Sequence, residues 1–218
     1  MPPTSPPERR FVRWLLVWSV ALVAAHVFYN LTWTMHSSPA ELKALFGLNY
    51  ESSLASWTSI VTMALLGLAC FGVGDQRALG GWMWCGAFFL YLSLDDGSKL
   101  HERLGWWSGV GDGNGYAWTK VVLPVIGALG ACVLVYLWRA TRGEAAARRH
   151  LHAAFALWGL ALALELPEMY LRDSGRTLRD FSIHLYPQVL EESCELVAPG
   201  IMLAGVVTLL RTSPSREG

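Results

Sequence analysis

Long apolar stretches separated by short polar segments dominate the pattern of this chain. A stretch of about 20 predominantly apolar residues is long enough to cross a bilayer as a helix. Six segments approach this length, of which the third is short: Phe11–Trp33, Leu54–Val73, Leu79–Leu94, Val121–Trp138, Leu151–Leu171 and Val189–Leu210. The pattern therefore predicts an all-α, polytopic membrane protein. We expect one integral membrane domain over residues 1–218, folded as a six-helix transmembrane bundle.

The composition points the same way. Of 218 residues, 53% are hydrophobic and 16% are charged, which is more apolar than a typical soluble domain. The 11 Trp residues fit a membrane protein, since Trp collects at lipid–water interfaces. A formal net charge of zero gives no reason to expect a nucleic-acid partner. Four isolated Cys residues favour buried thiols over disulfides or a zinc cluster. Membrane lipids are the expected partners, and the oligomeric state stays open.

The basic residues predict the orientation. Arginines precede the first stretch, which is too long for a signal peptide and lacks a clean cleavage site, so we expect an uncleaved anchor. The positive-inside rule then favours both termini in the cytoplasm. This puts ten of the 17 Lys and Arg residues there: Arg9, Arg10, Arg13, Arg77, Arg139, Arg142, Arg148, Arg149, Arg211 and Arg216. The bias is modest, and the arginines of residues 172–179 oppose it.

Acidic residues lie at the ends of three predicted spans. Asp95 and Asp96 end the third, Glu165 and Glu168 end the fifth, and Glu191, Glu192 and Glu195 begin the sixth. With the termini inside, all of these acids lie at the outer face, where a bundle would gather them in one pocket. Ionisable groups at membrane depth are costly and usually functional. We therefore predict a carboxylate/histidine site near the outer leaflet.

The segment after the third span gives the first part of this site. We expect the third span to continue as a helix through residues 95–104, which would put Asp95 and Glu102 two turns apart and within about 20° of each other, with Asp96 and His101 on a neighbouring face. Gly97 is a residue at which this helix could break. The alternative is an interfacial helix whose charges are simply solvated.

The start of the sixth span gives the second part. His184, Gln188, Glu191 and Glu195 form one polar stripe at helical spacing. Three carboxylates within five residues repel one another, so protons or a cation must neutralise them. The alternative is a solvated helix start, where the helix dipole favours acidic residues.

In the fifth span, Pro167 is expected to kink or end the helix beside Glu165. His26 of the first span is better explained as a packing residue than as a ligand.

Carboxylate-rich sites with one or two imidazoles suit Fe, Mn or Zn, whereas all-oxygen sites suit Ca or Mg. We predict a divalent metal ion, Fe, Zn or Mn. The predicted ligands are Asp95, Glu102, Glu165, His184, Glu191 and Glu195, and the predicted catalytic residues are Glu192 and His101. The chain lacks the Glu-x-x-His pairs of ferritin-like di-iron bundles and has only Glu-x-x-Glu at 165–168 and 192–195.

At these residues the chain resembles a family of uncharacterised bacterial multi-pass membrane proteins. Residues 93–104 are similar to its SLDE…HERL signature, with Asp96 where Glu is usual, and residues 191–195 are similar to its EExxE signature. Residues 49–57 resemble a further segment of that family. The resemblance implies a six-span protein of the bacterial inner membrane and no particular activity. Ser93, Asp95 and His101 also give a distant similarity of design to intramembrane zinc hydrolases such as alkaline ceramidases, which is an analogy only.

Three functions follow from the predicted site. The first is a metal-dependent membrane enzyme, a hydrolase or oxidase, that acts on a lipid or another amphiphile. The alternative is a proton- or cation-coupled transporter or channel that uses the same carboxylates. Against it, the sequence shows no inverted repeats and no polar line through the inner halves of the spans. The third is a carrier of b-type haem that uses His26 with His101 or His184.

Overall fold

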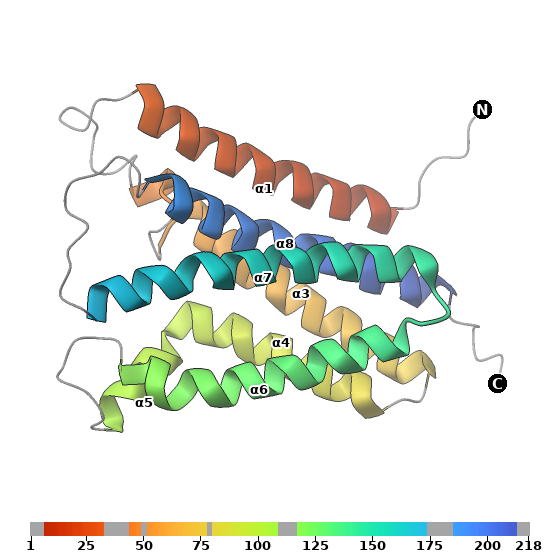
Figure 1. The fold of residues 1–218 in the computed structure, drawn as a ribbon. Coiled ribbons are helices and arrows are strands. Elements are labelled where there is room, and N and C mark those ends of the chain that lie inside the picture. The colour runs from red at the N-terminus through yellow and green to blue at the C-terminus, as the bar shows by residue number, and fades with distance from the viewer. Residues whose placement is uncertain are drawn as a thin grey trace. The chain divides into compact units, whose positions relative to one another are not determined.

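The computed structural model describes residues 7–32, 44–48, 52–77, 80–108, 117–173 and 185–212. Its long elements are all α-helices, and no β-strand occurs within these ranges (Figure 1). The labelled helices are α1 (Pro7–Thr32), α3 (Leu54–Arg77), α4 (Gly80–Ser98), α5 (Leu100–Trp107), α6 (Ala117–Ala140), α7 (Ala145–Asp173) and α8 (Leu185–Thr212). The predicted all-α class is confirmed for the described part of the chain.

Four helical segments are long and apolar enough to cross a membrane. They are Arg9–Phe28, Leu54–Arg77, Val121–Ala140 and Val189–Thr212. These overlap the first, second, fourth and sixth predicted spans, and they support a multi-pass membrane protein. The third and fifth predicted spans are also helical, as α4 and α7, but they are not among the four. A helix satisfies its backbone polar groups internally, which is what apolar segments need in lipid.

Capping and turn contacts explain where two of the helices begin. The Ser53 hydroxyl oxygen accepts a hydrogen bond from the backbone N–H of Ser56 at 3.1 Å, so Ser53 caps the first turn of α3. Between α6 and α7, the hydroxyl of Thr141 donates to the carbonyl of Leu137 at 2.8 Å. The N–H of Glu144 then donates to the Thr141 carbonyl at 3.0 Å, directly before α7 starts.

The chain forms two compact units, and residues 1–59 and 152–204 make up the first. Within this unit α1 and α8 pack closely, because a Cβ atom on Gly200 would lie 2.9 Å from the Leu16 side chain. The indole N–H of Trp18 donates to the Thr58 hydroxyl oxygen at 3.0 Å. One apolar cluster is formed by the buried residues Leu22, Leu48, Ala55 and Leu196. Hydrophobic packing with a few specific hydrogen bonds therefore holds this unit together.

Residues 60–151 and 205–218 form the second unit, in which α4 packs on α3 through small residues. A Cβ atom built on Gly67 would lie 2.9 Å from the Gly86 carbonyl oxygen, and one on Gly86 would lie 2.6 Å from the Phe71 ring. The hydroxyl of Ser93 donates to the backbone carbonyl of Ile60 at 2.8 Å. Small residues at membrane helix interfaces let two backbones approach closely.

Basic residues gather at one end of this second unit, where α3 ends and α7 begins. Arg77 lies 3.6 Å from the carboxylate of Glu144, which also accepts a hydrogen bond from the Thr212 hydroxyl at 3.2 Å. The guanidinium groups of Arg142 and Arg148 lie 5.4 and 5.3 Å from the centre of the same indole ring, that of Trp138. The Ser93–Ile60 contact lies at the opposite end of α3.

One helix boundary differs from the sequence-based expectation and one agrees with it. The third span does not continue as one helix to Leu104, because α4 ends at Ser98 and α5 begins at Leu100. The fifth span passes Pro167 and covers its predicted range to Leu171, because α7 runs on to Asp173; of a kink or an end at Pro167, the end is excluded. A proline removes one backbone hydrogen bond, and membrane helices tolerate that loss where neighbouring groups take over the freed carbonyl.

The close α3–α4 contact leads to a stability prediction. Gly86→Leu should destabilise the protein by about 1–3 kcal/mol, since the new side chain overlaps the Phe71 ring and the Gly67 carbonyl. The matched control is Gly127→Leu in α6, where an added Cβ meets nothing within 4 Å. Thermal unfolding in detergent should separate the two variants. Equal midpoints would contradict a tight glycine contact between α3 and α4.

Candidate functional site

The centre of the candidate site is a pair formed by Asp95 and His101. Nδ1 of His101 lies 2.7 Å from Oδ2 of Asp95, and the backbone N–H of His101 donates to Oδ1 of the same carboxylate at 2.7 Å. Asp95 is 7% exposed and is the last buried residue of α4. An ionised carboxylate can only accept hydrogen bonds, so in the ionised pair Nδ1 carries the ring proton. Proton transfer or metal coordination by His101 would then proceed through Nε2.

A break in the helix makes this pairing possible. Lys99 has φ 53° and ψ 41°, a left-handed conformation that ends α4 and precedes the first residue of α5. The N–H of Arg103 donates to the Lys99 carbonyl at 3.1 Å, which closes the first turn of α5. The corner turns the chain so that His101 returns to the carboxylate six residues before it. A continuous helix would have put these two side chains on different faces.

Neighbouring helices fix the two sides of the corner. Two residues before Asp95, the Ser93 hydroxyl donates to the Ile60 carbonyl and ties this end of α4 to α3. The short helix α5 packs against the start of α6. Two of its residues, Trp106 and Trp107, are 76% and 67% exposed. Exposed Trp residues beside ionisable groups are typical of the lipid–water interface. The surroundings therefore fit a site at one edge of the hydrocarbon layer.

The acids of α8 belong to the other unit. Glu191 and Glu192 are half-buried, Glu195 is exposed, and all three interact with other groups. Cys194, between them, is buried with a free thiol. The hydroxyl of Ser193 donates to the carbonyl of Val189 and so belongs to the helix itself.

The predicted metal site is not assembled within the described part of the chain. Among the side chains that the structure describes, no group of three or more His, Cys, Asp and Glu residues could hold a metal ion. The side chains of Glu102, Glu165 and His184 lie outside the described residues. Both oxygens of Asp95 face donors of His101, and each keeps a further lone pair, so the ligand role of Asp95 stays a prediction. The continuous helix on which the alignment of Asp95 with Glu102 was conditional does not form, because α4 ends at Ser98 and α5 begins at Leu100.

His26 has the packing role expected of it. Its Nδ1 accepts a hydrogen bond from the backbone N–H of Leu48 at 3.3 Å. The bond connects α1 to the segment before α3, beside the cluster that contains Leu22 and Leu48. A histidine in this position satisfies a backbone donor in an apolar region.

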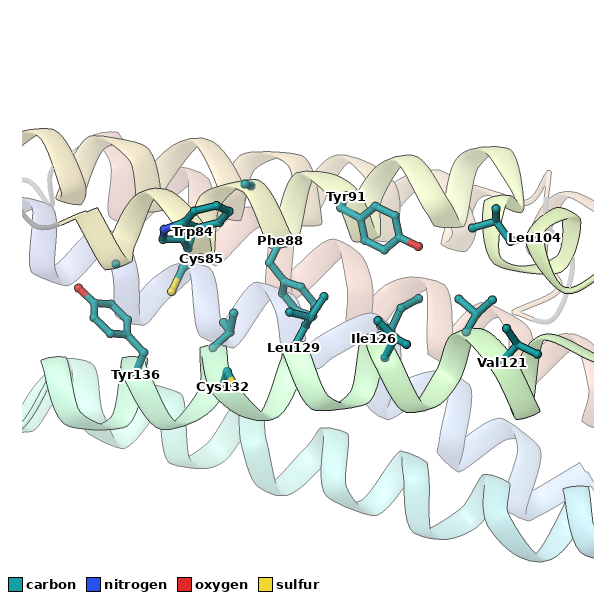
Figure 2. Close-up of a pocket in the computed structure, with 15 residues that line it drawn as sticks. Trp84, Cys85, Phe88, Tyr91, Leu104, Val121, Ile126, Leu129, Cys132 and Tyr136 are labelled. Carbon is teal, nitrogen blue, oxygen red and sulfur yellow. The ribbon is translucent and has the colours of Figure 1, made fainter. Parts of the chain in front are cut away.

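An apolar groove of about 820 Å³ lies between α4 and α6, within the second unit (Figure 2). Residues of α4 and α6 form its two long walls, and Leu104 of α5 lies at one end. None of its lining residues is charged. Tyr91 stands one helical turn before Asp95, and Leu104 one turn after His101, so this end of the groove adjoins the pair. The apolar pattern predicted the helices but gave no sign of the groove between them.

The two acceptors of Asp95 lead to a prediction for Asp95→Asn. Asparagine offers a single carbonyl oxygen to the two donors of His101, so one donor loses its partner. We expect a loss of about 1–3 kcal/mol in stability. Nitrogen-15 NMR of the imidazole should show that His101 no longer holds its proton on Nδ1 alone. Asp75→Asn, at an exposed position of α3 in the same unit, should leave the His101 spectrum unchanged, and a wild-type spectrum in Asp95→Asn would contradict the pairing.

Comparison with known proteins places the chain in a family. No curated protein and no solved structure matches it. One family model, described as a domain of unknown function (DUF8692), matches residues 14–210. The match includes the α4–α5 corner as well as the acids of α8. The chain therefore belongs to the DUF8692 family.

Proposed function

We propose that this protein is a membrane-embedded enzyme that acts on a lipid or another amphiphile at the Asp95–His101 pair. The observation that carries the proposal is the 2.7 Å contact between a buried carboxylate and Nδ1 of a half-buried histidine. A carboxylate that holds Nδ1 selects one tautomer and fixes the ring, as in acid–base catalysis by histidine. The backbone hydrogen bond from His101 to the same carboxylate adds a second restraint on the ring's position.

In this proposal Asp95 is a positioning residue and His101 the catalytic residue. His101 takes up or delivers a proton through Nε2, while Asp95 stabilises the charged imidazolium. A positioned acid–base group of this kind contributes about 10²- to 10⁴-fold to a rate. The half-buried setting at a helix end lets an amphiphile approach from the membrane while its polar part stays near water.

A divalent metal ion, Fe, Zn or Mn, remains part of the proposal. Histidines that bind a metal through one ring nitrogen usually give the other N–H to a carboxylate, and His101 has this arrangement. His101 would be one ligand, and Glu102, Glu165, His184, Glu191 and Glu195 are the further candidates from the sequence. The ion would lower the pKa of a bound water and so supply a nucleophile. Glu192 remains a candidate general base.

We also propose that α4 and α7 cross the membrane, giving six spans with both termini in the cytoplasm of a bacterial cell. A helix rises about 1.5 Å per residue, so 19 residues in α4 and 29 in α7 extend about 28 and 43 Å. Both are close to or above the hydrocarbon thickness of about 30 Å. The arginines at the α3–α7 end of the second unit support the orientation through the positive-inside rule. The Asp95–His101 pair would then lie at the outer leaflet.

Turnover of membrane lipids tests the proposed enzyme. Protein in nanodiscs made from a bacterial lipid extract would be incubated, and the lipids analysed by mass spectrometry. We expect products from the wild type, and about a 10²- to 10⁴-fold lower rate for His101→Ala. Asp95→Asn should also slow the reaction, whereas Asp75→Asn, at an exposed position of α3, should not. Product formation that is unchanged in His101→Ala would refute the assignment.

Elemental analysis of the same samples tests the metal. We expect a stoichiometric divalent ion in the wild type and a loss of that ion in His101→Ala. A metal-free protein that still converts lipid would leave proton transfer by His101 as the mechanism and would remove the metal from the proposal. A transporter predicts a different outcome, namely no lipid product and a pH-dependent uptake into liposomes that Asp95→Asn abolishes.

A further inference from the structure

The groove between α4 and α6 has two chemically different ends. At one end, a Cβ atom on Gly81 would overlap the ring of Tyr136, so these two residues are in contact. In the middle, a Cβ atom on Gly130 would lie 3.4 Å from the Phe88 ring, which sets the antiparallel register of the two helices. The other end is lined by Tyr91 and Leu104 (Figure 2), which lie one helical turn from Asp95 on α4 and from His101 on α5. The groove is thus closed by an aromatic ring at one end and adjoins a polar pair at the other.

The dimensions of the groove match one extended hydrocarbon chain. The α6 wall runs from Val121 to Tyr136, which at 1.5 Å per residue is about 22 Å. One leaflet accounts for half of the hydrocarbon layer, or about 15 Å, so a chain from that leaflet fits within this length. The length of the groove and its uncharged lining therefore suit a lipid chain.

At the Tyr136 end of the groove, aromatic rings pack against each other. The rings of Trp82 and Tyr136 meet edge to face, with centroids 5.9 Å apart and planes at 80°. Trp82 is completely buried, so it holds the Tyr136 ring against the position of Gly81. Aromatic pairs prefer this geometry, which favours one position of the Tyr136 ring at this end of the groove.

We propose that this groove binds a single acyl chain of a lipid, with the polar part of that lipid at Asp95–His101 and the chain terminus at Tyr136, which limits the chain length. The inference depends on the proposed function only in treating the bound lipid as the substrate. Its basis is the combination of an uncharged groove, a length suited to one chain, and an ionisable pair at the opposite end from the aromatic stop. An amphiphile is the ligand whose two parts match these two ends.

Photo-crosslinking with a defined lipid tests the chain position. Protein would be reconstituted in vesicles that contain phosphatidylglycerol with a diazirine either near the carboxyl end or near the methyl end of one acyl chain. The first probe should label residues around Leu104 and Val121, and the second should label residues around Cys132 and Tyr136. Labelling spread evenly over the exposed faces of the helices, for example at Met83, would overturn the inference.

Variants of α4 make this test specific to the groove. Ala87 lines the groove and is exposed, so Ala87→Phe should fill it without a cost to folding and reduce the labelling by about tenfold. Met83→Phe is the matched control, because Met83 is 48% exposed on the same helix and does not line the groove. Equal loss of labelling in both variants, or in neither, would contradict a bound chain.

The length limit is tested at Tyr136. Tyr136→Ala should move the label from the methyl-end probe beyond Cys132 toward Trp82 and should enrich longer chains among the lipids that copurify. Tyr136→Phe keeps the ring and should behave as the wild type. An unchanged chain distribution in Tyr136→Ala would remove the length limit.

His101→Ala separates this inference from the proposed function. In that variant the methyl-end probe should still label residues around Cys132 and Tyr136, because α4 and α6 hold the chain, even where turnover is lost. A groove that is labelled as expected in a protein that converts no lipid would retain the chain site and refute the enzyme. Turnover that depends on His101 without any labelling of the groove would do the opposite.

Discussion

The candidate site depends on the need of a buried carboxylate for hydrogen-bond partners. Asp95 is placed at the end of an apolar helix, where an unpaired charge would be costly. Its partners come from its own chain, because the left-handed residue Lys99 turns α5 back so that the backbone and the ring of His101 both reach the carboxylate. The helix break, the short α5 and the orientation of the imidazole are consequences of one corner. The same corner thus gives the Asp95 carboxylate its hydrogen-bond partners and fixes the position of the His101 imidazole.

Helix packing then decides what lies next to this pair. Small residues let α3 and α4 approach until Gly67 and Gly86 touch, and a serine hydroxyl adds a hydrogen bond between the same helices. On its other side α4 faces α6, where aromatic rings and glycines alternate and the two walls stay apart over most of their length. The groove that results is apolar because its walls come from helices with few polar side chains. Its closed end is set by the fixed ring of Tyr136 against Gly81.

The acids at the start of the sixth span differ from Asp95, which is buried and paired with His101. Because α8 begins at Leu185 and has no acid in its first turn, the helix dipole does not account for these acids, and Glu191 and Glu195 stay predicted ligands. The sequence grouped them with Asp95 because both clusters fall at the same predicted membrane face. Charge pattern alone cannot tell a carboxylate that holds a histidine from one that holds a metal ion, since both need an acid near an apolar segment. The 2.7 Å distance from Oδ2 of Asp95 to Nδ1 of His101 shows that one of the predicted ligands holds a histidine.

The sequence by itself determined the helical class and the position of four apolar helices, because apolar stretches of this length must satisfy their backbone groups within the segment. It also singled out Asp95 and His101, since charged residues beside such stretches are rare. Their pairing was missed because it arises from a positive φ at Lys99, a residue type that seldom adopts that conformation. Only the tertiary structure decided the groove, since its walls meet through the sizes of side chains far apart in the sequence, such as Gly81 and Tyr136. Hydrophobic periodicity says which segments are helical but not how closely two of them pack.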